Sequence, residues 1–95
     1  MRLRGKVDAN QAAIVRALRQ IGASVQSLAD IGDGCPDLLV SFRNRMFLME
    51  VKDGNQPASK RRLTEAEENW IRNWQAPVLI VESVDQALKF MNSIG

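Results

Sequence analysis

Apolar positions recur along the chain at two spacings, one typical of helices and the other of strands. The first apolar segment has helical spacing and a plausible end at Gly22, while Asp8 and Gln11 fit a capping box at its start. Residues 24–28 then have room for a short strand, and residues 29–36 have the composition of a loop. The apolar positions of this predicted helix are Ile14, Ala17, Leu18 and Ile21.

Two apolar runs of strand length, 37–42 and 46–52, are separated only by residues 43–45. Two such runs with a short connection predict a β-hairpin. Both runs carry apolar residues on both faces, so we expect these strands near the middle of a sheet that is covered by helices.

The second half of the chain begins with a polar, basic loop over 53–62 and continues with a helix that Thr64 and Glu67 open as a capping box. A buried strand is predicted over 78–81, and a last helix follows, capped by Ser83. The predicted order is therefore α-β-β-β-α-β-α, a single α/β domain that spans residues 1–95.

Composition limits the chemistry that such a domain can perform. Among the 95 residues there is no histidine and no tyrosine, which excludes imidazole catalysis and a tyrosyl-DNA intermediate. The single cysteine excludes an internal disulfide and a multi-cysteine zinc site. We find no signal peptide and no apolar run long enough for a membrane span, so we expect an intracellular protein without a membrane partner. A net charge of +2 permits nucleic acid as a partner without requiring it.

Three charged residues, Asp37, Glu50 and Lys52, flank or interrupt the apolar runs of the hairpin. If the connection is a two-residue turn at 43–44, antiparallel pairing places Asp37 directly opposite Glu50, with their Cβ atoms about 5 Å apart. A slip of one or two residues would leave the two carboxylates diagonal but still within reach of one ion. Lys52 follows Glu50 by two positions and therefore lies on the same strand face.

Two carboxylates this close destabilise the fold unless a proton or a cation lies between them. With oxygen ligands and no histidine, the natural cation is Mg²⁺ or Mn²⁺, and the carbonyl of Val51 is a further possible ligand. Such a site suits hydrolysis of a phosphodiester, in which Lys52 would orient the attacking water or neutralise a phosphate oxygen. Taken singly, however, a Pro-Asp step is usually a turn, and a Glu-x-Lys pair usually lies at the surface.

The segments 34–37 (Gly-Cys-Pro-Asp) and 49–52 (Met-Glu-Val-Lys) resemble the PD-(D/E)XK nuclease superfamily and, more closely, the VRR-NUC domain, a virus-type replication-repair nuclease. The resemblance runs from about residue 8 to residue 90. It implies a mixed four-stranded sheet flanked by helices, with Asp37 and Glu50 as metal ligands and Lys52 as the catalytic lysine. It further implies dependence on Mg²⁺ or Mn²⁺ and cleavage of structured DNA such as four-way junctions or flaps. It also implies that the protein is a homodimer and that it is located in the cytoplasm of a bacterium or phage-infected host.

This chain departs from the family pattern at two positions. Gln11 occupies the place where the family has an acidic residue that points at the metal, and its helical phase with Ile14 and Leu18 predicts an inward side chain. A role for Gln11 in the capping box with Asp8 is equally consistent with the sequence. Glu67 stands where relatives often carry Gln, and its alternative role is to cap Thr64.

Basic and aromatic residues after the second hairpin strand are candidate DNA contacts. The loop residues could hold phosphates that enter the site, or they could form an ordinary solvated loop. Trp70 and Trp74 share a helix face and could stack on bases, although packing in a core or a dimer interface is the commoner role. Cys35 has no His partner and is interpreted as a small space-filling residue. The candidate loop contacts are Asn55, Lys60, Arg61 and Arg62.

Two functions therefore remain open. The first is a divalent-metal-dependent endonuclease that acts on DNA. The second is a DNA- or junction-binding module of the same fold whose catalysis is weakened or lost because Gln11 replaces an acidic ligand. RNA is also possible as the substrate.

Overall fold

The computed structural model describes residues 9–94. The helices and strands follow one another in the predicted order α-β-β-β-α-β-α. One short 3₁₀ turn lies in the basic loop. The elements are α1 (Gln11–Gln20), β1 (Ser24–Ser27), β2 (Leu38–Phe42), β3 (Arg45–Val51), η1 (Ala58–Lys60), α2 (Glu65–Asn73), β4 (Val78–Val81) and α3 (Val84–Asn92).

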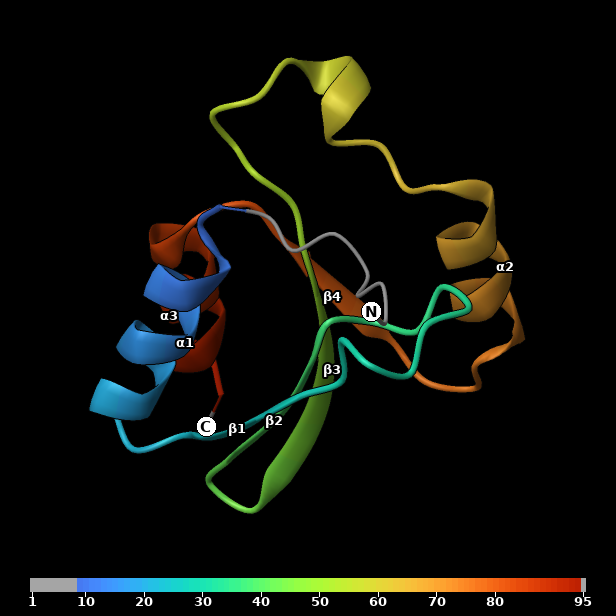
Figure 1. Cartoon of the computed structure of the whole chain (residues 1–95). Coiled ribbons are helices and arrows are strands. Elements are labelled where there is room, and N and C mark those ends of the chain that lie inside the picture. Colours follow the sequence, from blue (N-terminus) through green and yellow to red (C-terminus); the bar gives the residue numbers. More distant parts are fainter. Residues whose placement is uncertain (1–8, 95) are drawn as a thin grey trace.

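The four strands form one mixed sheet in the order β1-β2-β3-β4. β2 pairs antiparallel with both β1 and β3, whereas β4 runs parallel to β3. The two strands of the predicted hairpin are therefore the central strands of the sheet, as their apolar composition indicated. α1 and α3 pack side by side on one face of this sheet, and α2 lies on the other side, apart from them (Figure 1).

The hairpin turn sets the register of the central strands. Arg43 and Asn44 both have positive φ, 52° and 63°, which is the backbone of a tight two-residue turn that matches strand twist. Phe42 then pairs with Arg45, and the register continues to the pair Leu38↔Met49. The predicted two-residue connection is therefore confirmed.

The core lies between the sheet and the helix pair α1–α3. Ile14 and Leu18 of α1 are fully buried there, as are Met49 of β3 and Met91 of α3. The opposite face is less well covered than we expected, because Met46 is 70% exposed and Ile80 is 48% exposed. Helices therefore flank the sheet as expected, but they leave these two side chains exposed.

Side chains and glycines fix the ends of the helices. Asn10 is the N-cap residue of α1, and its amide donates to the backbone oxygens of Lys52 and Glu82 at 3.0 and 2.9 Å. This helix start is thereby tied to the ends of β3 and β4. Gly22, at φ 96°, follows the other end of α1 as predicted. Asp8, the other half of the capping box predicted for this helix, lies outside the described residues.

α2 differs from the other two helices in its packing. The predicted capping box is present, since Thr64 accepts from the N–H of Glu67 and Glu67 accepts from the N–H of Thr64. None of the described residues of α2 is buried. Trp70 and Trp74 stack on each other with ring centroids 4.6 Å apart, and Trp74 remains 47% exposed, so packing of these rings in the core is excluded.

Within residues 9–94, no helix combines the length and the apolar character that a membrane crossing needs.

Candidate active site

A cavity of about 500 Å³ lies where β2 begins and β3 ends, between the loop that precedes β2 and the start of α2. Charged side chains from several segments of the chain line it. They are Asp33, Asp37, Glu50, Lys52, Lys60, Arg62 and Glu67. The three residues that the sequence singled out as a catalytic group thus share one cavity.

Asp37 immediately precedes β2 and continues the hairpin register by one position beyond Leu38↔Met49, which places it opposite Glu50. Its Oδ2 accepts a 2.7 Å hydrogen bond from the backbone N–H of Val51. The carboxylate of Asp37 therefore spans the two strands at the point where their regular pairing ends.

Glu50 is a buried carboxyl among other acids. It is only 2% exposed, and its Oε1 has no hydrogen-bond partner among the described residues. Burial raises the pKa of Glu50 to about 9, with further increases from the charge of Asp37 and from the contact and charge of Glu67, while Lys52 opposes the shift. The site is therefore short of positive charge when this carboxyl is ionised.

Lys52 lies just past β3 and is 7% exposed. Its Nζ donates to Glu67 Oε1 at 2.8 Å and lies 3.6 Å from Glu50 Oε2. Its backbone N–H donates to the oxygen of Val81 at 2.9 Å. A buried ammonium is thus fixed at both its backbone and its side chain, beside the carboxyl of Glu50.

Glu67 caps α2, the alternative role that the sequence offered, and it also contacts Lys52. Its Oε1 accepts from the backbone N–H of Thr64 as part of the helix cap and also from Lys52. Burial alone would raise the pKa of Glu67, but the hydrogen bonds from Lys52 and Thr64 outweigh it, so the pKa is lowered overall and the carboxylate stays ionised.

Gly34 explains how α2 reaches this site. Its φ is 84°, and a Cβ at this position would collide with the backbone of Ala66 in the first turn of α2. Only a residue without a side chain allows the loop before Asp37 to pack this closely against the helix that carries Glu67.

Only two of the four candidate DNA contacts line the cavity. Lys60 and Arg62 line the cavity, as predicted for residues that would guide phosphates into it. Arg61 instead pairs with Glu82, its Nη1 lying 3.2 Å from Oε1. Asn55 is not part of the cavity wall, and its backbone N–H donates to Asp53 in a local turn.

Gln11 lies in the first turn of α1, directly after the Asn10 that contacts Lys52. It is 7% exposed and faces inward with Ile14 and Leu18, as its helical phase predicted. It is not part of the cavity wall, however, and it lines a different hollow beside β1.

Cys35 lines the cavity beside Asp37. Burial raises the pKa of this thiol, and the charges of Glu50 and Asp37 raise it further. The protonated thiol that results is a poor nucleophile, which agrees with a space-filling role.

Comparison with known proteins identifies this architecture. No protein-family model and no curated protein matches the chain. A solved structure described as a VRR_NUC domain does match, with a TM-score of 0.59 and 29% sequence identity over 90% of this chain and 92% of that one. The chain is therefore a nuclease-like domain with the VRR-NUC fold.

Proposed function

We propose that this chain is a divalent-metal-dependent endonuclease that hydrolyses phosphodiester bonds in structured DNA, such as four-way junctions or flaps, during replication or repair. The observation that carries the proposal is the position of Asp37 and Glu50 one step past Leu38↔Met49, the last regular pair of the hairpin, with the ammonium of Lys52 3.6 Å from Glu50. The VRR-NUC fold supports a nuclease in general.

The carboxyl groups fit a divalent cation. Glu50 combines an unpartnered buried oxygen with a pKa raised by burial and by two neighbouring acids, and a cation would relieve both. Within residues 9–94, no three acidic or thiol side chains form a complete metal cage. That suits Mg²⁺ or Mn²⁺, because Mg²⁺ is commonly held by one or two carboxylates together with waters and substrate phosphates. Asp37, Glu50 and the carbonyl of Val51 would hold the ion.

When bound, such an ion would lower the pKa of water and would compensate the charge on phosphate oxygens. The other steps belong to the chain itself. Lys52 orients the attacking water or neutralises a non-bridging phosphate oxygen. Glu67 holds Nζ of Lys52 in place, and Lys60 and Arg62 position the phosphates at the mouth of the cavity.

The test is cleavage of a panel of duplex, single-stranded, flap and four-way-junction DNA with Mg²⁺ or Mn²⁺. Lys52→Ala should lower the cleavage rate at least about 100-fold, the usual effect of losing a group that transfers or orients a proton. Lys89→Ala, an exposed cation on α3, is the matched control and should cleave normally. Equal rates for the two variants would overturn the catalytic assignment.

The second candidate function is a DNA- or junction-binding module that has lost catalysis. It is favoured by one observation, the position of the uncharged Gln11 outside the catalytic cavity. A binder would retain junction DNA but leave it intact with Mn²⁺, and Gln11→Glu would be the variant to test for restored cleavage.

We further propose that the chain works as a homodimer. Exposed apolar side chains, among them Met46, Trp74 and Ile80, provide surface that a second copy could cover. Light scattering after gel filtration should give twice the chain mass of 10.6 kDa, and a single-chain mass at micromolar concentration would contradict the dimer.

A further inference from the structure

A hollow of about 470 Å³, which we call the tryptophan hollow, adjoins the catalytic cavity on the side of α2. Asp33 and Ala66 belong to the walls of both, so the two spaces meet where the loop before β2 packs against the first turn of α2 (Figure 1). The proposed reaction uses none of the other residues that line the hollow. These residues are Asn69, Trp70, Asn73 and Trp74.

The two tryptophans form an aromatic surface at the edge of this hollow. Their rings stack with centroids 4.6 Å apart and an interplanar angle of 23°, and Trp74 is 47% exposed. Since no described residue of α2 is buried, the pair does not fill a core. Exposed aromatic rings of this kind are a typical surface for the stacking of unpaired nucleic-acid bases.

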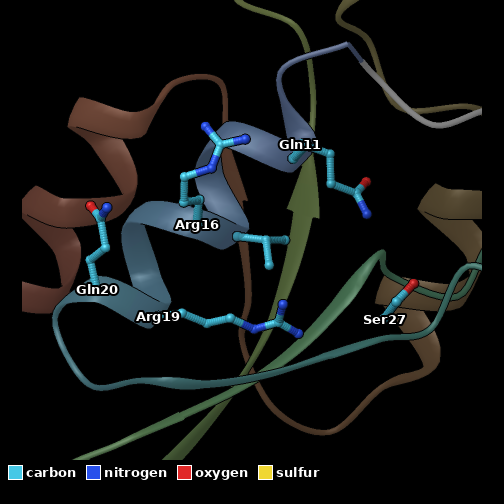
Figure 2. A pocket seen from close by; sticks show the side chains of 7 residues that line it. Gln11, Arg16, Arg19, Gln20 and Ser27 are labelled. Atoms are coloured by element: carbon cyan, nitrogen blue, oxygen red, sulfur yellow. The ribbon is translucent and has the colours of Figure 1, made fainter.

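The charge of the tryptophan hollow fits a base rather than a phosphate. Figure 2 shows Arg16 and Arg19 on α1 beside the hollow next to β1, whereas none of the described residues that line the tryptophan hollow is a cation. Asp33 would repel a phosphate, but its carboxylate can accept a hydrogen bond from an amino or imino group on the edge of a base. Phosphates find cations in the adjoining cavity, because Lys60 and Arg62 line it.

A second copy of the chain fits this hollow less well. It would cover Asp33 and Ala66, and with them the rim of the cavity that DNA must reach. It would also bury the charge of Asp33, whereas the centre of a protein interface is usually depleted of charged residues. Met46 and Ile80, which lie on β3 and β4, remain as exposed apolar surface for a second copy.

We propose that the tryptophan hollow binds one unpaired base of the DNA substrate, next to the nucleotide whose phosphate enters the catalytic cavity. The base stacks on the exposed ring of Trp74, and its edge faces Asp33. In a continuous duplex, neighbouring base pairs cover both faces of every base, so the hollow selects a strand with an unpaired nucleotide, such as a flap. The inference rests on the proposed function in one respect, that DNA is the substrate.

Intrinsic fluorescence reports directly on this hollow, because Trp70 and Trp74 are the only two tryptophans of the chain. The probe is a short single-stranded oligonucleotide, added to the full chain in EDTA so that the measurement does not depend on cleavage. Stacking of a base should quench the tryptophan emission. An abasic oligonucleotide with the same number of phosphates should leave the emission unchanged, and equal quenching by both probes would overturn the inference.

Variants of Trp74 separate stacking from charge. Trp74→Ala should weaken binding of a labelled single-stranded oligonucleotide at least about fivefold in anisotropy titrations, the usual effect of losing one stacked base. Trp74→Phe keeps an aromatic face and should recover most of the affinity. The control Ile21→Ala removes another exposed apolar side chain, at the end of α1, and should bind like the unmodified chain.

Equal affinities of Trp74→Ala and Ile21→Ala for the oligonucleotide would overturn the inference. A Trp74→Ala variant with half the mass of the unmodified chain in light scattering would also overturn it, because the tryptophans would then contact a second copy. If the unmodified chain cleaves DNA but the oligonucleotide does not quench its emission, this site alone is overturned. Normal cleavage by Lys52→Ala would instead contradict the proposed catalytic assignment and leave this site standing.

Discussion

Oδ2 of Asp37 accepts a 2.7 Å hydrogen bond from the backbone N–H of Val51, the residue directly after Glu50. This bond extends the pairing of the two central strands past their last regular pair through a side chain. It also fixes the orientation of one carboxylate relative to the strand that carries the other. The proposed metal site is thus preorganised by the hairpin itself, because the same bond sets strand spacing and ligand position.

The first prediction concerns the stability of the metal-free chain. Glu50 has a folded-state pKa of about 9, above its ordinary value of 4.5. Its contribution to the free energy of unfolding is therefore fully present below about pH 4.5 and is lost as the pH rises through 9. Glu50→Gln should melt at least about 4 °C above the unmodified chain at pH 9, the shift that corresponds to roughly 1 kcal/mol in a domain of this size.

At pH 5 the two melting temperatures should converge, because Glu50 is then protonated. The exposed Glu68→Gln is the control and should show no such dependence on pH. Scanning calorimetry in EDTA measures both variants. Parallel melting curves for Glu50→Gln and the unmodified chain across this range would show that Glu50 ionises normally.

The second prediction concerns metal affinity. Glu50 must lose its proton before it can bind a cation, so the association constant for Mn²⁺ should rise up to about tenfold per pH unit between pH 6 and 8. Isothermal titration in two buffers of different ionisation enthalpy should detect about one proton released per ion bound. Asp37→Asn should lose most of this affinity. Affinity that does not change with pH would mean that the ion binds elsewhere.

The third prediction separates the two roles of Glu67. Glu67→Ala removes both the partner of Lys52 and half of the helix cap, so it should lower both kcat and the melting temperature. Thr64→Ala breaks the cap alone and should lower the melting temperature while kcat stays near normal. Glu67→Gln keeps an oxygen acceptor and should largely restore kcat. If Thr64→Ala lowers kcat as much as Glu67→Ala does, then Glu67 acts only through helix stability.

The fourth prediction concerns the basic loop. Lys60→Ala and Arg62→Ala should each weaken DNA binding and reduce the slope of log affinity against log salt by about one. Arg61→Ala should have a smaller effect, since Arg61 pairs with Glu82. Anisotropy titrations at several salt concentrations compare the three variants. An effect of Arg61→Ala as large as those of the other two would show that its ion pair opens to receive DNA.

The sequence predicts the elements and the meeting of Asp37, Glu50 and Lys52 because these depend on local rules. A two-residue turn with strict alternation determines which residues face each other, and both were evident from the spacing of the two apolar runs. The contact between Lys52 and Glu67 was not predictable in this way. It depends on how closely the loop at Gly34 approaches α2, which is a tertiary distance.

Gln11 also shows that tertiary position cannot be predicted from the spacing of residues in a helix. Helical phase correctly predicts that its side chain points inward, but phase does not specify which of two neighbouring hollows the side chain enters. The two long-range hydrogen bonds that anchor Asn10 to the ends of β3 and β4 likewise have no sequence signature. The exposure of Met46 was not predicted, because apolar composition alone does not reveal how far a flanking helix extends over a strand.

No residue in the described part of α2 is buried. The catalytic cavity therefore has a rigid wall at the sheet and a more compliant wall at α2. Glu50 lies in β3, and Asp37 and Lys52 directly adjoin β2 and β3, whose opening requires the core to unfold, whereas Glu67 sits on a helix without a buried residue in its described part. Amide protons of α2 should therefore exchange with solvent at a lower free-energy cost than those of β3. A wall of this kind can withdraw to admit a branched or bulky substrate without disturbing the carboxylates opposite.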